Sequence, residues 1–154
     1  MDTEFLINQL IGTKYVSWNK KQWSKDNKSP FYISKEKEID IEYVRKNGCN
    51  CAGFINILLR NKSIPIPDYD SDYPGGTFSY GFEFKWTRID LKKQYPKYTL
   101  FLSPYISGIN EGHLSILLPY NHVAHCYLDK GVVIEKINFN NYEYVCTELC
   151  KQLT

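Results

Sequence analysis

The chain has 154 residues, of which 43% are hydrophobic and 23% charged, so it fits one globular domain over residues 1–154 and not a disordered protein. Lys and Arg total 19 against 17 Asp and Glu, and this near balance gives no basis for nucleic-acid binding. No apolar run approaches the roughly 18 residues that a membrane span needs, and acids stand where a secretory signal carries positive charge. We therefore expect a cytoplasmic protein, or one packaged in a particle.

The first half of the chain predicts two helices separated by loops. Helical spacing of apolar residues covers 2–11, and Gly12 ends that pattern as a helix C-cap would. Residues 19–40, rich in Lys, Asn and Ser, indicate a loop. Residues 50–61 predict a second helix that Asn50 can cap, and this helix has almost no polar face, so we expect it to be buried. Turns are expected over 62–77, and alternating aromatic residues favour a strand over 78–86.

The second half predicts mainly strands. Strand patterns cover 98–102, 113–118, 123–128 and 131–137, and residues 141–153 could form a final helix. Helices followed by consecutive antiparallel strands indicate an α+β fold.

The five cysteines have irregular spacing, and their number is odd. Free thiols in a reducing compartment are the better interpretation. Cys146 and Cys150 could share a metal ion with a histidine, but no second ligand pair has the usual spacing. We therefore expect no metal and no cofactor.

Cys51 is the first candidate for chemistry, because it lies in the first turn of the predicted buried helix. The helix dipole and the free N–H groups at such a position favour a thiolate, so we expect Cys51, and not Cys49, to have a low pKa. A nucleophilic cysteine also needs a histidine base. The alternative is a small core residue, which is what most free cysteines are.

All three histidines lie within 13 residues, at 113, 122 and 125. A turn over residues 119–121 would pair Leu118 with His122 across a hairpin. Side chains alternate between the faces of a strand, so His113 and His125 would then share one face and His122 would point to the other. One imidazole could therefore orient the other, as in a catalytic triad.

At these residues the sequence resembles the NlpC-type cysteine peptidases, a compact branch of the papain-like fold. Residues 50–55, Asn-Cys-Ala-Gly-Phe-Ile, are similar to the family's Asp-Cys-Ser-Gly-Phe-Val nucleophile motif. Residues 12–18 are similar to its Gly-x-x-Tyr-x-Trp motif, and residues 112–117 to its Gly-His-Val-Gly-Ile-Tyr strand. The family's third polar residue, often His, follows its base by 12 positions, as His125 follows His113.

The resemblance implies a papain-like α+β fold and a thiol hydrolase that cleaves a peptide or isopeptide bond. It implies Cys51 as nucleophile, His113 as base, His125 as orienting residue and Tyr15 as a residue that helps to position the substrate. The backbone N–H of Cys51 would form part of the oxyanion hole. The sequence departs from the family at Asn50, where Asp is usual, and at Ala52, where Ser is usual.

Two other functions stay open. One is a binding or structural module that kept the fold and lost turnover, which the departures beside Cys51 favour. The other is a thiol-dependent acyltransferase or lipid-amide hydrolase, but the relatives with that activity often carry His before Cys. The expected partner is a peptide or another amide-containing substrate, and the oligomeric state is left open.

Overall fold

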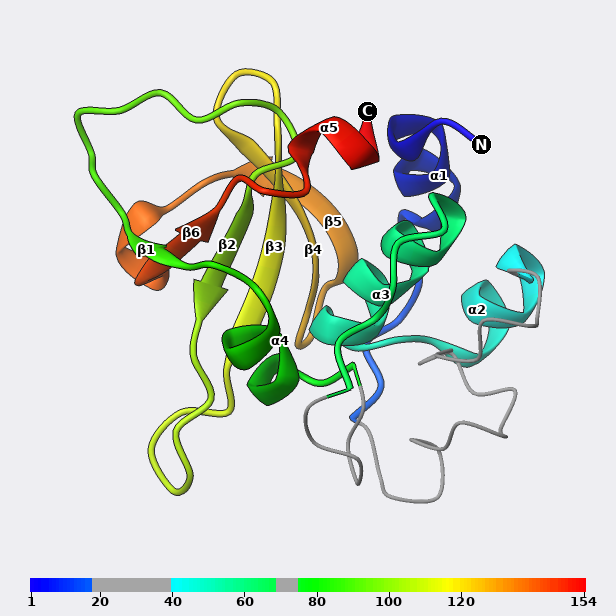
Figure 1. Ribbon diagram of the computed structural model, residues 1–154. Coiled ribbons are helices and arrows are strands. Elements are labelled where there is room, and N and C mark those ends of the chain that lie inside the picture. The colour runs from blue at the N-terminus through cyan, green and yellow to red at the C-terminus, as the bar shows by residue number, and fades with distance from the viewer. Residues whose placement is uncertain (18–39, 69–74) are drawn as a thin grey trace.

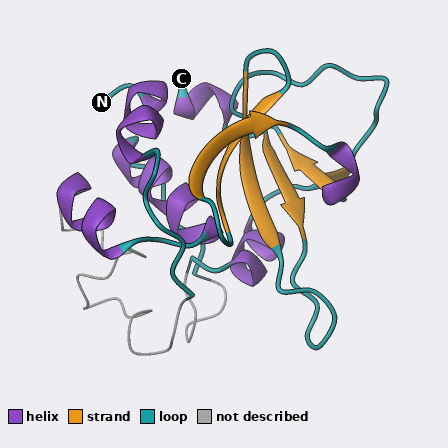
Figure 2. Ribbon diagram, turned by 180° about the vertical axis from the view of Figure 1, so that it is seen from behind, coloured by secondary structure: helices purple, strands orange, loops and turns teal. Residues whose placement is uncertain are grey.

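The structure is a computed structural model, and it describes residues 1–17, 40–68 and 75–154. Most of the helices gather on one side of an antiparallel sheet, which confirms the predicted α+β class (Figures 1 and 2). Within the described ranges, no helix has the length and apolar character needed to cross a membrane. The loop predicted over 19–40 lies almost entirely outside these ranges.

The sheet has six strands in the order β1-β6-β2-β3-β4-β5, and every neighbouring pair is antiparallel. The strands are β1 (Thr87–Arg88), β2 (Leu100–Ser103), β3 (His113–Leu118), β4 (His122–Tyr127), β5 (Gly131–Lys136) and β6 (Tyr144–Cys146). The four strands predicted between residues 98 and 137 correspond to β2 to β5, with ends that differ by at most two residues.

The helical elements are α1 (Thr3–Leu10), α2 (Ile41–Asn47), α3 (Cys51–Asn61), α4 (Thr77–Glu83), the short 3-10 helix η1 (Phe139–Asn141) and α5 (Cys150–Leu153). As predicted, α3 is buried over most of its length, from Cys51 to Leu59. It packs against the apolar face of the sheet, where Leu114, Ile116 and Ala124 belong to the same core cluster. Burial of this apolar surface is the main term that holds α3 in place.

The predicted helix ends agree with the structure because the local capping chemistry is strong. The Asp2 carboxylate accepts a hydrogen bond from the N–H of Phe5 at the start of α1, and Gly12 follows that helix with φ of 87°. The Asn50 side chain accepts a hydrogen bond from the N–H of Gly53 at 2.7 Å and so caps α3.

The strand predicted over 78–86 is wrong, because most of that segment forms α4. Aromatic residues two apart suggest a strand, but aromatic residues four apart also share one helix face. The ring centroids of Phe78 and Phe82 are 4.9 Å apart, and those of Tyr80 and Phe84 are 5.6 Å apart. Gly76 precedes the helix in an extended conformation.

The helix predicted over 141–153 is also wrong for most of its length. Tyr144–Cys146 forms β6, which pairs with β1 on one side and β2 on the other, and only Cys150–Leu153 is helical. Val145 and Cys146 are buried there, so the long-range ladder and its burial override the local helical spacing. The helix α2 and the short strand β1 were not predicted.

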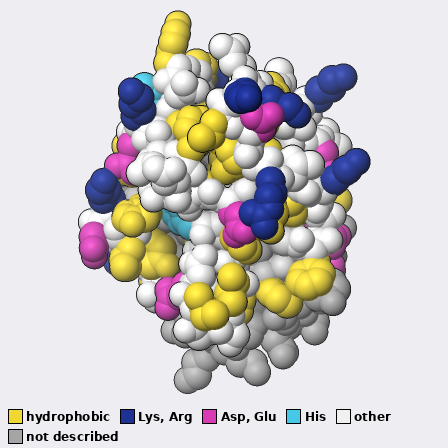
Figure 3. Space-filling model, turned by 90° about the vertical axis from the view of Figure 1, so that its left-hand side faces the viewer, with side chains coloured by type: hydrophobic (Ala, Val, Ile, Leu, Met, Phe, Trp, Pro, Cys, Tyr) yellow, Lys and Arg dark blue, Asp and Glu magenta, His cyan; other side chains and the backbone are white. Residues whose placement is uncertain are grey.

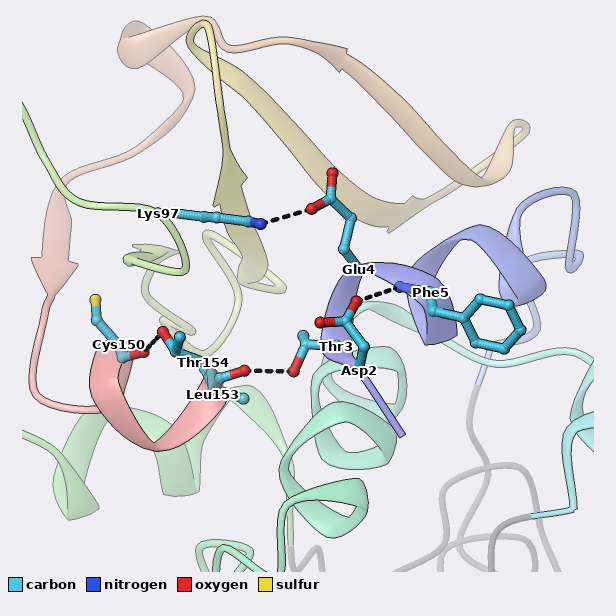
Figure 4. Close-up of polar contacts among 8 residues, drawn as sticks. All are labelled: Asp2, Thr3, Glu4, Phe5, Lys97, Cys150, Leu153 and Thr154. Carbon is cyan, nitrogen blue, oxygen red and sulfur yellow. Dashed lines mark hydrogen bonds and ion pairs between the residues drawn. The ribbon is translucent and has the colours of Figure 1, made fainter.

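The two ends of the chain meet beside the sheet (Figures 1 and 4). The buried Thr3 hydroxyl donates a hydrogen bond to the carbonyl of Leu153. Nearby, Lys97 forms an ion pair with Glu4 in which both side chains are well exposed, at 39% and 44%. The buried hydrogen bond and the exposed ion pair should therefore differ in their contribution to stability.

We expect Thr3→Val to lower the free energy of unfolding by about 1–3 kcal/mol, because it leaves a buried carbonyl without its donor. Glu4→Gln should lower it by less than about 1 kcal/mol, because the ion pair that it removes is exposed and screened. Urea denaturation of both variants measures the difference. A larger loss for Glu4→Gln would contradict this assignment.

Candidate active site

The thiol of Cys51 lies at the point where β3 and β4 separate. The β3–β4 ladder runs only from Ile116↔Ala124 to Leu118↔His122, although β4 continues to Tyr127. The N–H and the carbonyl of Leu117 both hydrogen-bond the segment on the β2 side, at Thr99 and Tyr98. This direction alternates along a strand, so the N–H of Leu114, three residues earlier, points toward β4. That N–H hydrogen-bonds the Cys51 thiol. The first turn of α3 therefore occupies the gap that the shortened ladder leaves.

Thr77, the first residue of α4, is the second polar neighbour of the thiol. Its Oγ1 is 3.9 Å from the Sγ of Cys51. Its methyl group lies where a side chain at Gly112 would project, since an added Cβ there would come within 2.6 Å of it. Gly112 and Leu114 flank His113 in the chain. Leu114 hydrogen-bonds the thiol through its N–H, and Gly112 lies against Thr77, which also contacts the thiol.

Asn56 fixes the position of α4 relative to α3. It is fully buried in α3, and its amide group donates to the carbonyl of Gly75 at 3.0 Å. Its side-chain oxygen accepts a hydrogen bond from the hydroxyl of Tyr80 at 2.7 Å. The start of α4, and Thr77 with it, is therefore held against the helix that carries Cys51.

His113 and His125 are brought together as the hairpin register predicts. Nε2 of His113 is 2.7 Å from Nδ1 of His125. Both rings also lie near Tyr127, with centroids 5.5 and 5.4 Å from that ring, and Tyr142 stacks on His113 at 6.1 Å. His113, His125 and Tyr127 alternate along their strands with residues of the core that contains α3, so their rings lie on the opposite face of the sheet. Figure 3 shows histidine surface only as small, separate patches, one of them bordered by hydrophobic side chains.

His122 is not part of this group. The predicted pairing of Leu118 with His122 is confirmed, and His122 shares its strand face with Ala124 and Cys126. Its Nδ1 contacts the carbonyl of Tyr120 at 2.9 Å. The choice of His125 over His122 as the partner of His113 thus agrees with the geometry.

Glu135 and Lys130 extend the histidine pair. Nε2 of His125 is 2.8 Å from Oε2 of Glu135, and Nζ of Lys130 is 2.6 Å from Oε1 of the same carboxylate. The pKa of Glu135 is lowered, first by its hydrogen bond to Lys130 and then by the one to His125. The carboxylate is therefore ionised at neutral pH, and four side chains form a continuous chain of hydrogen bonds.

Tyr15 lies beside the segment that leads into α3. It pairs with Cys49 in a short parallel bridge, and Gly48 permits the close approach because a Cβ there would lie 2.8 Å from the carbonyl oxygen of Lys14. Burial, followed by the nearby thiols of Cys51 and Cys126, raises the pKa of Tyr15 to about 12. Its hydroxyl therefore stays protonated and can donate a hydrogen bond. The predicted motif continues to Trp18, which lies outside the described residues.

Burial makes the resting thiol and imidazole neutral. It raises the pKa of Cys51, and this effect outweighs the hydrogen bonds from Leu114, Thr77 and Ala52 that lower it. Burial and the neighbouring His125 lower the pKa of His113 to about 3. The expectation of a low-pKa thiol at Cys51 is therefore wrong for the free protein, because the N-terminal end of α3 is covered and not open to water.

Glu135, Lys130 and Thr77 were not predicted from the sequence. Glu135 could have been found, because the β4–β5 ladder pairs His125 with Val133, and Glu135 is the next residue on the same strand face. Thr77 gave no such signal, since its position depends on a helix that had been predicted as a strand.

No family model matches the sequence, and no curated protein matches it. Among solved structures, the NlpC/p60 domain of the peptidoglycan hydrolase SagA is similar, with a TM-score of 0.55, 16% identity and 94% of each chain covered. A hypothetical invasion protein of Mycobacterium tuberculosis matches with a TM-score of 0.53 and 18% identity, over 94% of this chain and 60% of that one. A protein similar to a lipoprotein of the NLP/P60 family from Staphylococcus aureus matches with a TM-score of 0.51 and 13% identity, over 94% of this chain and 40% of that one. The chain therefore has the NlpC-type papain-like fold that its sequence predicted.

Proposed function

We propose that the protein is a cysteine hydrolase that cleaves an amide bond, with Cys51 as nucleophile, His113 as base and His125 as orienting residue. The observation that carries this proposal is the 2.7 Å contact between His113 and His125, in a strand whose next residue, Leu114, hydrogen-bonds the Cys51 thiol. A nucleophile, a base and a group that orients the base are the parts that acyl transfer to a thiol requires.

The mechanism uses Nδ1 of His113, because its Nε2 is occupied by His125. Sγ of Cys51 attacks the carbonyl carbon of the substrate while Nδ1 of His113 takes the thiol proton. The amide C–N bond breaks, the leaving amine receives that proton, and a thioester remains on Cys51. Water then attacks the thioester, with His113 again as base, and releases the acid and the free thiol. Because the resting pair is neutral, proton transfer accompanies attack and does not precede it.

The substrate is proposed as a peptide or isopeptide. One similar structure belongs to a peptidoglycan hydrolase, so peptides from bacterial cell walls are the first substrates to test. The neutral Tyr15 hydroxyl lies near the thiol and is proposed to donate a hydrogen bond to the bound substrate. The backbone N–H of Cys51 is proposed as one oxyanion donor, since it lies at the start of α3.

Asn50 and Ala52, which replace the family's usual Asp and Ser, do not by themselves indicate an inactive module. Asn50 accepts the capping hydrogen bond from Gly53 that a carboxylate at this position would also accept. Ala52 is almost completely buried, so no substrate-facing group is lost there. Both residues are compatible with a working nucleophile at the start of α3.

A reducing location is proposed from the cysteines. All five are free, and all five are buried. Free thiols of this kind persist in the cytoplasm or inside a particle that retains reducing conditions.

Cys51→Ala should abolish hydrolysis, whereas Cys49→Ala should retain most of it, because the thiol of Cys49 has no role in the mechanism. Incubation with cell-wall peptides and with linear and isopeptide-linked peptides, followed by mass spectrometry of the products, tests this. Equal activity of Cys51→Ala and the unchanged protein would rule out the thiol mechanism.

The alkylation of Cys51 should be slow near neutral pH and should rise through about pH 9 and beyond, because burial raises the pKa of Cys51 above its ordinary value of 9.0. Rates of iodoacetamide labelling, mapped to each cysteine, give the profile. Cys49 serves as the internal reference, since its pKa is raised further. A plateau for Cys51 below about pH 7 would instead indicate a preformed thiolate.

His125→Ala should lower turnover by about 10²-fold or more with little change in substrate binding, because it removes the group that orients the base. His122→Ala is the matched control and should leave turnover unchanged, since His122 faces the other side of β4. Steady-state kinetics of both variants separate kcat from KM. Equal losses in the two variants would contradict the assignment.

A further inference from the structure

His125 uses both ring nitrogens, and its two partners differ in chemistry. Nδ1 faces Nε2 of His113 at 2.7 Å, and Nε2 faces Oε2 of Glu135 at 2.8 Å. An ionised carboxylate can only accept hydrogen bonds. The contact with Glu135 therefore requires a proton on Nε2 of His125.

The proton on Nε2 of His125 determines which of the other ring nitrogens of His125 and His113 carry a proton. A neutral imidazole carries one N–H, so Nδ1 of His125 must be an acceptor. Nε2 of His113 must then carry the proton in their shared hydrogen bond, which leaves Nδ1 of His113 without one. That nitrogen is the one that the proposed mechanism needs as base.

We infer that Glu135 is a positioning residue that sets the tautomers of His125 and, through it, of His113. The inference rests on the proposed function only for its consequence in catalysis, because the order of protons follows from the contacts themselves. Glu135 touches neither the thiol nor a substrate in this scheme. It acts on the base from two hydrogen bonds away.

Lys130 holds the carboxylate in place. The Glu135 side chain is 34% exposed, so alone it could turn toward water, but Nζ of Lys130 binds its second oxygen at 2.6 Å. Lys130 comes from the turn between β4 and β5, and its own side chain is 54% exposed. The lysine should therefore help to keep the carboxylate oriented and contribute less than the carboxylate itself.

Nuclear magnetic resonance can read these tautomers directly. The chain has three histidines, so long-range proton–nitrogen spectra of the imidazole rings contain few signals. At about pH 8, where unperturbed imidazoles are neutral, His113 and His125 should both carry the proton on Nε2. His122 should carry it on Nδ1, because that nitrogen contacts the carbonyl of Tyr120. His122 is thus an internal reference with the opposite tautomer.

Glu135→Leu should remove the single tautomer of His125 and with it that of His113, while His122 stays unchanged. Glu135→Gln keeps an acceptor oxygen without the charge and should restore the tautomers in part. Glu4→Leu is the matched control, because it also removes the acid of an exposed Glu–Lys pair and should alter none of the three rings. Single Nε2–H tautomers for both His113 and His125 in Glu135→Leu would overturn the inference.

Kinetics add a second readout that separates this inference from the proposed function. With any substrate that the protein cleaves, Glu135→Leu should lower kcat about 10-fold or more and leave KM nearly unchanged, with partial recovery in Glu135→Gln. Unchanged kcat in Glu135→Leu would overturn the role in catalysis. If the unchanged protein cleaves nothing, the proposed function fails, and the tautomers still decide whether Glu135 controls the rings.

Discussion

The site depends on the first turn of α3 filling the gap where β3 and β4 separate. If the ladder between these strands continued past Ile116 and Ala124, the N–H of Leu114 would bind β4 and would not meet the Cys51 thiol. The gap is held open by the buried, almost entirely apolar α3, which packs on the same face of the sheet. The core and the candidate site therefore share the same packing of α3 against the sheet.

Burial determines the protonation of the candidate nucleophile and base. It keeps the thiol of Cys51 protonated and the ring of His113 neutral, although a helix start favours the thiolate. In the proposed mechanism, the thiol proton of Cys51 therefore passes to His113 as the substrate is attacked. The atom that accepts this proton is proposed to be Nδ1 of His113, which the contacts from His113 through His125 and Glu135 to Lys130 leave free.

The sequence predicted those parts of the fold that local chemistry controls. The cap at Asn50, the end of α1 near Gly12 and the hairpin from β3 to β4 agree with the structure because a side-chain cap, a glycine with positive φ and a short turn fix them. The segments around α4 and β6 were predicted wrongly because contacts with distant residues decide them. The same limit applies to the site: His125 was found from hairpin register, whereas Thr77 depends on the long-range hydrogen bonds of Asn56.

The most direct test of the central claim is acetylation by p-nitrophenyl acetate, an acyl donor that requires no knowledge of the natural substrate. We predict a burst of one nitrophenolate per chain, an acetyl group on Cys51 by peptide mapping, and slow return of the free thiol. In His113→Ala both the burst and the return should be slower, because the base is missing. Acetylation spread equally over several cysteines, or an unchanged burst in His113→Ala, would contradict the assignment of Cys51 as nucleophile and His113 as base.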